Sequence, residues 1–416
     1  MSRARGVPVS VVAAGFVTVL VGFTSSAAIV FQAARAGGAS PAEVSSWIGA
    51  LGIGMGVTCI GLSLRYRAPI VTAWSTPGAA LLVTSLVGVP LADAIGAFMF
   101  SAVLIVAVGV SGLFERAIGH IPLPLAQALL AGVLIRFGLA VFTAMRVEFG
   151  LVFSMFVVYV LARRWSPRYA MVLVLGVGIA AAGAGGLLRL GALHLAVTHP
   201  HFISPAFSAS TMLSVGIPLF LVTMASQNMP GVAVLRGLGY QTPISPLITT
   251  TGLVTLVLAP FGAFAINLAA ITAAICAGPE AHEDPARRYM ASVVAGGCYL
   301  LIGVFGATVA ALFAAFPAAL VAGVAGLALL PTIASSLAGA LTDVSTREPA
   351  LITFLVTASG VTLAGVGSAF WGVVAGGLAL LVFTAGACAP GSSGQSAPTG
   401  AGPRRGRSGG SGADRR

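Results

Sequence analysis

Apolar residues run along this chain in long blocks, and short polar breaks separate each block from the next. Most blocks hold about 20 residues, enough for a helix to cross a hydrocarbon layer of roughly 30 Å. The pattern predicts an all-α integral membrane protein rather than several soluble domains. We expect fourteen membrane-spanning segments, at approximately 9–31, 46–63, 69–84, 92–113, 122–143, 147–162, 169–188, 211–230, 244–262, 265–278, 288–313, 317–340, 349–366 and 368–388.

The third and tenth of these segments are interrupted in a way that an ordinary membrane helix is not. The third contains Pro69 and Pro77, and the tenth is too short to cross the membrane as a helix. We expect each to be discontinuous, a short strand followed by a half-helix, with extended lead-ins at 69–74 and 260–265. Irregular backbone at membrane depth survives only beside protein or a water-filled cavity, so this pair of segments indicates a binding site.

Fourteen segments divide into two sets of seven, and an odd number forces the second set to enter the membrane from the opposite side. The chain is therefore expected to be an inverted repeat. A faint echo supports this: Ser25-Ser26 lies ahead of Arg35 much as Ser226-Gln227 lies ahead of Arg236. The expected parts are an N-terminus at 1–8, a first repeat at 9–189, an inter-repeat loop at 190–210, a second repeat at 211–388 and a disordered basic tail at 389–416.

Charge then orients the chain. Of 416 residues, 58% are hydrophobic and 7% charged, and the net charge is +11. Every basic residue is an arginine, and seventeen of the twenty-one fall on the cytoplasmic side if both termini are cytoplasmic. This is the positive-inside bias of a membrane protein, and no nucleic-acid partner is expected. Three arginines fall in outer loops, namely Arg35, Arg146 and Arg189.

The sequence gives little indication of a metal site or of catalytic residues. Four cysteines lie in or beside apolar segments without CxxC spacing, and His194, His199 and His201 have no carboxylate or cysteine nearby. We therefore expect no metal and no cofactor. The chain contains no catalytic motif and no lysine for an ATP-binding loop, so an enzyme and an ATP-driven pump are not expected.

Two half-helices that start near the midplane would point their N-termini at one place. Each terminus offers unpaired N–H groups and about half a positive charge, which makes an anion site without a lysine or arginine. Gln227 and Asn228, ahead of the helix-breaking Pro230, are candidates for binding a carboxylate or for holding the half-helices. The candidates at the half-helices themselves are Ser75, Thr76, Pro77, Gly78, Asn267 and Thr272.

Three ionisable residues carry further hypotheses. Arg136 is the one ionisable side chain placed well inside a predicted segment, which favours a gate contact or snorkelling over direct substrate binding. Glu280 and His282 lie at the cytoplasmic end of the tenth segment. They are either solvated loop residues or the carriers of a coupled proton.

Three stretches resemble the benzoate:proton symporter (BenE-type) family, and the resemblance extends over most of the chain. They are TAWSTPGAALL at 72–82, PLFLVTMASQNMPGVAVLRGLGY at 218–240 and NLAAITAAICAGPEAHEDPARR at 267–288. The resemblance implies the inverted-repeat fold of uracil permeases and sulfate-permease-type transporters. In that fold a core domain, segments 1–4 and 8–11, moves against a gate domain, segments 5–7 and 12–14.

The implied function is import of benzoate or a close aromatic carboxylate with protons across a bacterial cytoplasmic membrane. A homodimer is left open. Members of the family often carry a histidine just before the Asn-Leu-Ala-Ala-Ile-Thr run that starts at Asn267, and here that neighbourhood reads Gly-Ala-Phe264-Ala-Ile; Phe264 could instead stack on an aromatic substrate. The alternatives are transport of another organic or inorganic anion or of a nucleobase, and a passive anion channel.

Overall fold

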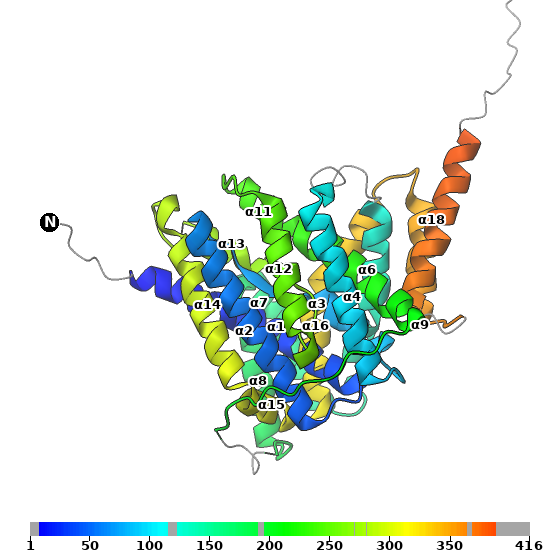
Figure 1. Ribbon diagram of the computed structural model, residues 1–416. Coiled ribbons are helices and arrows are strands. Elements are labelled where there is room, and N and C mark those ends of the chain that lie inside the picture. Colours follow the sequence, from blue (N-terminus) through cyan, green and yellow to red (C-terminus); the bar gives the residue numbers. More distant parts are fainter. Residues whose placement is uncertain are drawn as a thin grey trace, which may run out of the picture.

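The computed structural model describes residues 8–114, 123–189, 195–269, 271–279, 281–363 and 368–387. It is a bundle of helices with one small pair of strands, which confirms the all-α membrane class (Figure 1). By length and apolar composition, seven of the described helices could each cross a membrane, or eight if one bent pair counts as a crossing. Helix lies in each of the fourteen predicted ranges, and the number of crossings stays a prediction.

The helices of the first half follow the predicted blocks closely. The capping box at Ser40 and Glu43 starts the second helix where a Ser-Pro pair marks its beginning. The elements are α1 Val9–Ala36, α2 Pro41–Tyr66, β1 Thr72–Trp74, α3 Thr76–Ser85, α4 Leu91–Val110, α6 Leu123–Ala144, α7 Phe149–Trp165, η1 Pro167–Tyr169 and α8 Ala170–Ala184.

In the second half, α9 to α11 form one continuous helical path that includes two π-helical turns. The elements are α9 Ala209–Thr211, η3 Met212–Gly216, α10 Ile217–Thr223, η4 Met224–Asn228, α11 Met229–Gly237, α12 Ile244–Leu258, η5 Ala259–Phe261, β2 Ile266–Leu268, α13 Ile271–Ala277, η6 Pro285–Arg287, α14 Tyr289–Val304, α15 Gly306–Ala314, α16 Ala318–Ala340, α17 Arg347–Ser359 and α18 Ser368–Ala387.

Pro230 does not end its helix, contrary to the expectation from the sequence. The wide turn η4 comes directly before α11, and Pro230 sits in the first turn of α11. A π-helical turn accommodates the residue that cannot donate a backbone hydrogen bond, so the helix continues to Gly237.

The predicted segment at 288–313 is not one helix either. It divides into α14 and α15, which meet at a bend of 70°. Thr198, from the segment between the two halves, donates its Oγ1–H to Gly303 O and its N–H to Val304 O. These two carbonyls are therefore paired outside the helix, and the axis turns at that point.

The segment that joins the halves is a strap across the bundle, seen as the green trace that runs toward α9 in Figure 1. Besides Thr198, four of its backbone N–H groups are bonded to other elements, among them that of Ala196, which donates to Thr308 Oγ1 of α15. His201 donates to Ser46 Oγ, Ile203 to Pro260 O and Ala206 to Ala92 O. The strap thus connects α2, α4, η5 and the α14–α15 bend.

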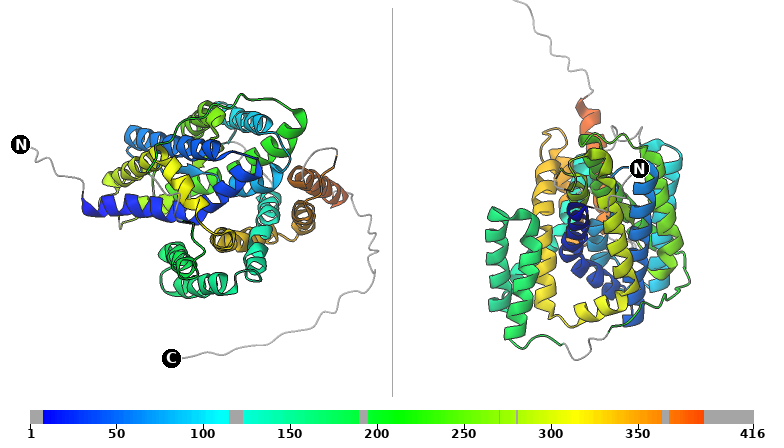
Figure 2. Two further views of the ribbon diagram at one scale, coloured as in Figure 1. Left: turned by 90° about the horizontal axis from the view of Figure 1, so that it is seen from below. Right: turned by 90° about the vertical axis from the view of Figure 1, so that its left-hand side faces the viewer.

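The helices gather into two groups (Figure 2). We call α1–α4 and α9–α15 the core group, in which α14 packs on α2, α12 on α4, and α1 on α3 and α14. The gate group is α6–α8 and α16–α18, in which α16 packs on α6 and α7, and α17 on α6 and α18. Contacts between the groups are fewer and run mainly through α1, α3 and η4.

Inside the core group, β1 pairs with β2 in antiparallel register, although the two strands come from different halves of the chain. Thr72, Ala73 and Trp74 lie opposite Leu268, Asn267 and Ile266. Two more backbone bonds extend the pairing, from Ser75 N to Ala265 O and from Ala269 N to Val71 O. The two strands satisfy each other's backbone groups inside the bundle, as irregular backbone in a membrane requires.

Candidate functional site

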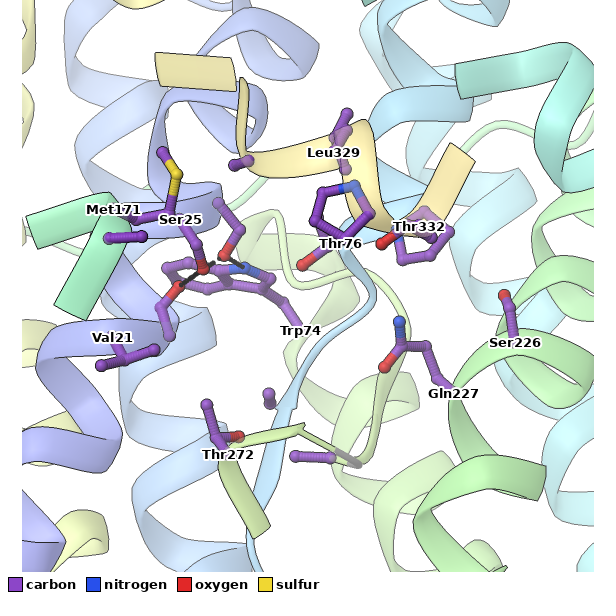
Figure 3. A pocket seen from close by; sticks show the side chains of 18 of the residues that line it. Val21, Ser25, Trp74, Thr76, Met171, Ser226, Gln227, Thr272, Leu329 and Thr332 are labelled. Carbon is purple, nitrogen blue, oxygen red and sulfur yellow. Dashed lines mark hydrogen bonds between the residues drawn. The ribbon is translucent and has the colours of Figure 1, made fainter. Parts of the chain in front are cut away.

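A cavity of about 380 Å³ lies where the strand pair meets the gate group. This volume is in the range of roughly 300–1,000 Å³ that is usual for small-molecule sites. Figure 3 shows its walls: Val21 and Ser25 of α1, Trp74 and Thr76 at β1–α3, Ser226 and Gln227 of η4, Thr272 of α13, Met171 of α8, and Leu329 and Thr332 of α16.

The first polar wall is the start of α3. Ser75 caps this helix by accepting the Gly78 N–H at 3.0 Å, and its Oγ also accepts from Thr223 Oγ1 at 3.2 Å. Thr76 and Pro77 line the cavity, whereas Ser75 and Gly78 lie fully behind that wall. A Cβ on Gly78 would come within 2.8 Å of both Ser75 Oγ and Leu219 Cδ1, so the close packing around this cap favours glycine.

The second polar wall is β2 with α13, where Ala269 and Thr272 line the cavity. Asn267 lies opposite Ala73, and directly opposed residues of an antiparallel pair point to the same face, here the face toward the cavity. The Asn267 side chain is nonetheless fully buried, with Nδ2 donating to Ala265 O at 2.8 Å. Its Oδ1 has no hydrogen-bond partner within the described residues.

The neighbouring amides of η4 do two different things. Gln227 lines the cavity, and Figure 3 shows its amide turned toward it. Asn228 is fully buried and accepts the Leu268 N–H through Oδ1 at 3.0 Å, while its Nδ2 contacts Met224 Sδ at 3.1 Å. One amide therefore faces the cavity, and the other holds β2.

Trp74 forms an aromatic wall of the cavity. Its indole N–H donates to Ser26 Oγ at 2.8 Å, and Ser26 in turn donates to Gly22 O, so the ring is fixed on α1. The Ser25-Ser26 and Ser226-Gln227 pairs, matched in sequence by their place before an arginine, thus meet at one cavity.

Several lining residues were not anticipated from the sequence, among them Trp74, Tyr159, Arg163 and Tyr299. Among the described residues that line the cavity, Arg163 of α7 is the one charged side chain, and none is a carboxylate. Helical periodicity places Tyr159 and Arg163 on one face of α7, but nothing in the sequence tells which face meets the core group.

The remaining candidates lie away from the cavity. Phe264 is fully buried between Trp47 and Phe98, with ring centroids 6.1 and 6.0 Å away, and is not among the lining residues. This position gives no support to stacking on a substrate.

Arg136 is exposed and donates to Ala358 O, near the C-terminal end of α17, at 3.0 Å. It therefore joins two gate helices. Its small cavity of about 60 Å³ also includes Thr84 and Ser85 of α3.

The two proton-carrier candidates follow α13 in the sequence. His282 is half-buried, and its Nδ1 accepts the Asp284 N–H at 3.0 Å. Glu280 lies outside the described residues. Arg288 braces the segment after α13 by donating to Ala277 O, His282 O and Glu283 O, so the end of α13 is tied to the start of α14.

Among the described residues, no group of three His, Cys, Asp or Glu side chains could hold a metal ion. Cys59 and Cys276 are buried, Cys298 is half-buried, and Cys388 is outside the described residues.

The fold is that of known membrane transporters. The chain superposes on the transmembrane domain of the cyanobacterial bicarbonate transporter BicA with a TM-score of 0.55 at 13% identity, covering 91% of this chain and 97% of that one. It superposes on SLC26A9 with a TM-score of 0.56 at 11% identity, covering 89% of this chain and 65% of the longer SLC26A9 chain. The shared fold and the long apolar helices together define a multi-pass membrane protein.

Comparison of the sequence with known proteins identifies the family. The model of the benzoate membrane transport protein family, BenE, matches residues 5–382. The chain is 49% identical over 380 residues to the inner membrane protein YdcO of Escherichia coli, covering 91% of this chain and 97% of that one. It is 42% identical over 369 residues to the benzoate membrane transport protein of Acinetobacter baylyi, covering 89% and 94%. The chain belongs to the BenE family of membrane transporters.

Proposed function

We propose that this transporter imports benzoate or a closely related aromatic carboxylate by proton symport, with the substrate held in the cavity beside Trp74. The observation that carries the proposal is the make-up of that cavity. It combines an aromatic wall and apolar side chains with the start of α3, a cavity-facing amide and no carboxylate among its described lining residues. Membership of the BenE family and the Acinetobacter relative point to the same substrate.

The carboxylate end is recognised at the polar walls. The α3 helix has ten residues, so its N-terminus carries a useful share of the helix dipole, and Thr76 lies there at the cavity surface. Gln227 can donate its amide N–H₂ to the same oxygen atoms. Because no described lining side chain is acidic, a bound carboxylate meets no like charge in the cavity.

Transport follows from the place of the cavity between the two groups of helices. Motion of the core group against the gate group would open the cavity to one side of the membrane and then the other. In the orientation with both termini cytoplasmic, Arg163, near the end of α7, marks the cytoplasmic side. The proton carrier is assigned to the segment with Glu280 and His282, since the cavity holds no acidic or histidine side chain in its described lining.

The test is binding and uptake of labelled benzoate by Gln227→Ala in proteoliposomes. We expect affinity to fall about 10- to 150-fold, since a hydrogen bond to a charged group is worth roughly 1.5–3 kcal/mol. The matched control is Gln241→Ala, which removes the same amide from an exposed loop position. Equal affinity in the two variants would remove Gln227 from the site.

Three further measurements decide the finer claims. Accumulation of benzoate against its own electrochemical gradient excludes a channel, and its loss on addition of a protonophore supports proton coupling. If sulfate or a nucleobase competes for the site and aromatic carboxylates do not, the proposed substrate is wrong. Retention of full proton coupling in His282→Gln would leave Glu280 as the carrier.

A further inference from the structure

A second cavity, of about 580 Å³, lies further along the boundary between the core and gate groups. Its polar wall is made by Gln32 and Arg35 of α1 and by Arg189, just after α8. The apolar wall is the turn from α15 into α16, including Phe316 and Val321. We call this space the distal cavity and the space beside Trp74 the central cavity.

The two cavities share one seam. On α1, Ser25 of the central cavity and Gln32 of the distal cavity are seven residues apart, which places them on the same helix face about 10 Å apart. On α16, Val321 and Ala328 have the same spacing, and they too line the distal and central cavities respectively. The same faces of the same two helices therefore line both spaces.

Aromatic rings fill the seam between them. Trp74, in the wall of the central cavity, has its ring centroid 5.5 Å from that of Phe23, and Phe23 is 6.1 Å from Phe313. Phe313 lies 5.4 Å from Phe316, which lines the distal cavity, and stacks on Phe31 at 4.5 Å. A continuous row of ring contacts thus connects the wall of the central cavity with the wall of the distal cavity.

The charge of the distal cavity is unusual for its side of the membrane. In the proposed orientation the distal cavity lies on the outer side of the membrane. Only three of the twenty-one arginines are predicted on that side, and two of the three, Arg35 and Arg189, line the distal cavity. Both guanidinium groups are exposed, and neither makes a hydrogen bond or ion pair within the part of the chain that the structure describes. Two cations without a partner in one hollow concentrate anions there.

We propose that the distal cavity is a second binding site, which captures an aromatic carboxylate from outside before it enters the central cavity. Arg35, Arg189 and Gln32 take the carboxylate, and the ring faces Phe316 at the head of the aromatic row. The assignment of an aromatic carboxylate rests on the proposed function, whereas the anion site itself rests on the two arginines and the cavity.

The first arm of the test measures the local potential without relying on transport. Gln32→Cys places a thiol in the cavity wall, and membrane-impermeant anionic and cationic methanethiosulfonates are applied from outside. We expect the ratio of anionic to cationic labelling rates to fall about 10-fold when Arg35→Gln and Arg189→Gln are added. The unsubstituted chain gives the background from its native cysteines.

The matched control is Arg146→Gln, since Arg146 is the third outer arginine and does not line the distal cavity. We expect this variant to change the labelling ratio less than twofold. A ratio that Arg35→Gln with Arg189→Gln leaves unchanged, or that Arg146→Gln lowers as much, would overturn the proposal.

The second arm uses benzoate. Benzoate outside should slow labelling by the anionic reagent, and the double substitution should raise the KM for external benzoate about 3- to 10-fold with little change in maximal rate. Arg35→Lys with Arg189→Lys keeps the charge and should retain most of the affinity. If the unsubstituted chain does not transport benzoate, the proposed function fails, and the labelling ratio still decides whether the distal cavity binds anions.

Discussion

The two strand–helix units that form the floor of the central cavity are equivalent in the inverted repeat, yet they are stabilised in different ways. In β1–α3, hydrogen bonds from the unit's own residues and from α1, α2 and α10 satisfy the polar groups, and the strand N–H groups of Thr72 and Trp74 donate to the sulfur atoms of Cys59 and Met55 in α2. Ser75 caps its own helix, and Thr72 Oγ1 bonds to Thr58 Oγ1 at 2.6 Å and Met55 O at 3.1 Å. The helix that follows has ten residues.

In β2–α13, the strand N–H groups likewise donate to side chains of neighbouring helices, here to oxygen atoms rather than sulfur atoms. Asn228 of η4 accepts the Leu268 N–H, Thr255 of α12 accepts the Ile266 N–H, and Arg288 bonds to the last carbonyl of the seven-residue α13. Ala265 has a positive φ of 40°, and Asn267 keeps an unpartnered Oδ1 among the described residues. Both strands are therefore held by side chains of neighbouring helices. The units differ in that the first has a side-chain N-cap on its helix, whereas the second contains a positive φ and, among the described residues, an unpartnered amide oxygen.

The largest effect is expected where the chain enters the second unit. Gly262 has φ +98°, and a Cβ there would meet the Trp47 ring at 1.8 Å. Gly262→Ala should therefore lower the free energy of unfolding by about 2–5 kcal/mol, from left-handed strain and overpacking together. Thermal unfolding of the purified protein measures it. Gly61→Ala, where a Cβ meets nothing within 4 Å, is the control, and similar melting temperatures for both variants would contradict the account.

Asn228→Ala should come next, because it leaves the Leu268 N–H buried without an acceptor. The expected loss of stability is about 1–3 kcal/mol. Gln227→Ala, one residue away and facing the cavity, should lose benzoate affinity with a smaller change in melting temperature. If Gln227→Ala destabilises the protein more than Asn228→Ala, the division of roles between the two amides is wrong.

Ser75→Ala tests the cap of the first unit. Loss of an N-cap costs about 1 kcal/mol, and replacement of a cap residue by glycine costs only a few tenths. We therefore expect the melting temperatures to rank as unsubstituted chain, Ser75→Gly and Ser75→Ala, from highest to lowest. A Ser75→Gly variant that melts with or below Ser75→Ala would show that Ser75 does not act through capping.

The smallest expected effect is a gain. Ala265→Gly removes the left-handed strain at φ 40°, worth roughly 1–2 kcal/mol, and loses part of this to the greater freedom of glycine in the unfolded chain. The free energy of unfolding should rise by less than about 1 kcal/mol. A lower melting temperature would show that the second unit is not strained at this residue.

Much of the fold follows from the sequence, because long apolar blocks and proline positions depend on local chemistry. Pro69 and Pro77 mark the irregular third segment, and the Ser40-Pro41 pair marks a helix start. The α14–α15 bend does not follow, since it depends on Thr198, distant along the chain.

The sequence also predicted some of the residues that line the central cavity, whereas their role in binding stays a prediction. Among the predicted substrate residues, Thr76, Pro77, Gln227 and Thr272 line the cavity. Ser75, Gly78, Asn228, Asn267 and Phe264 lie behind its wall, and their role in binding stays a prediction. Residue type and spacing reveal that a polar group exists in an apolar segment, but only packing decides whether it faces the cavity or braces the backbone.

The pairing of β1 with β2 also has a consequence for biosynthesis. Ribosomes deliver β1 long before β2, so the backbone groups of Thr72 and Trp74 wait for their partners while most of the chain in between enters the membrane. Folding of the cavity floor is therefore a late, long-range event, and such events are slow. A nascent chain stalled before Ile266 would contain the whole first repeat but would lack the strand pair at the floor of the central cavity.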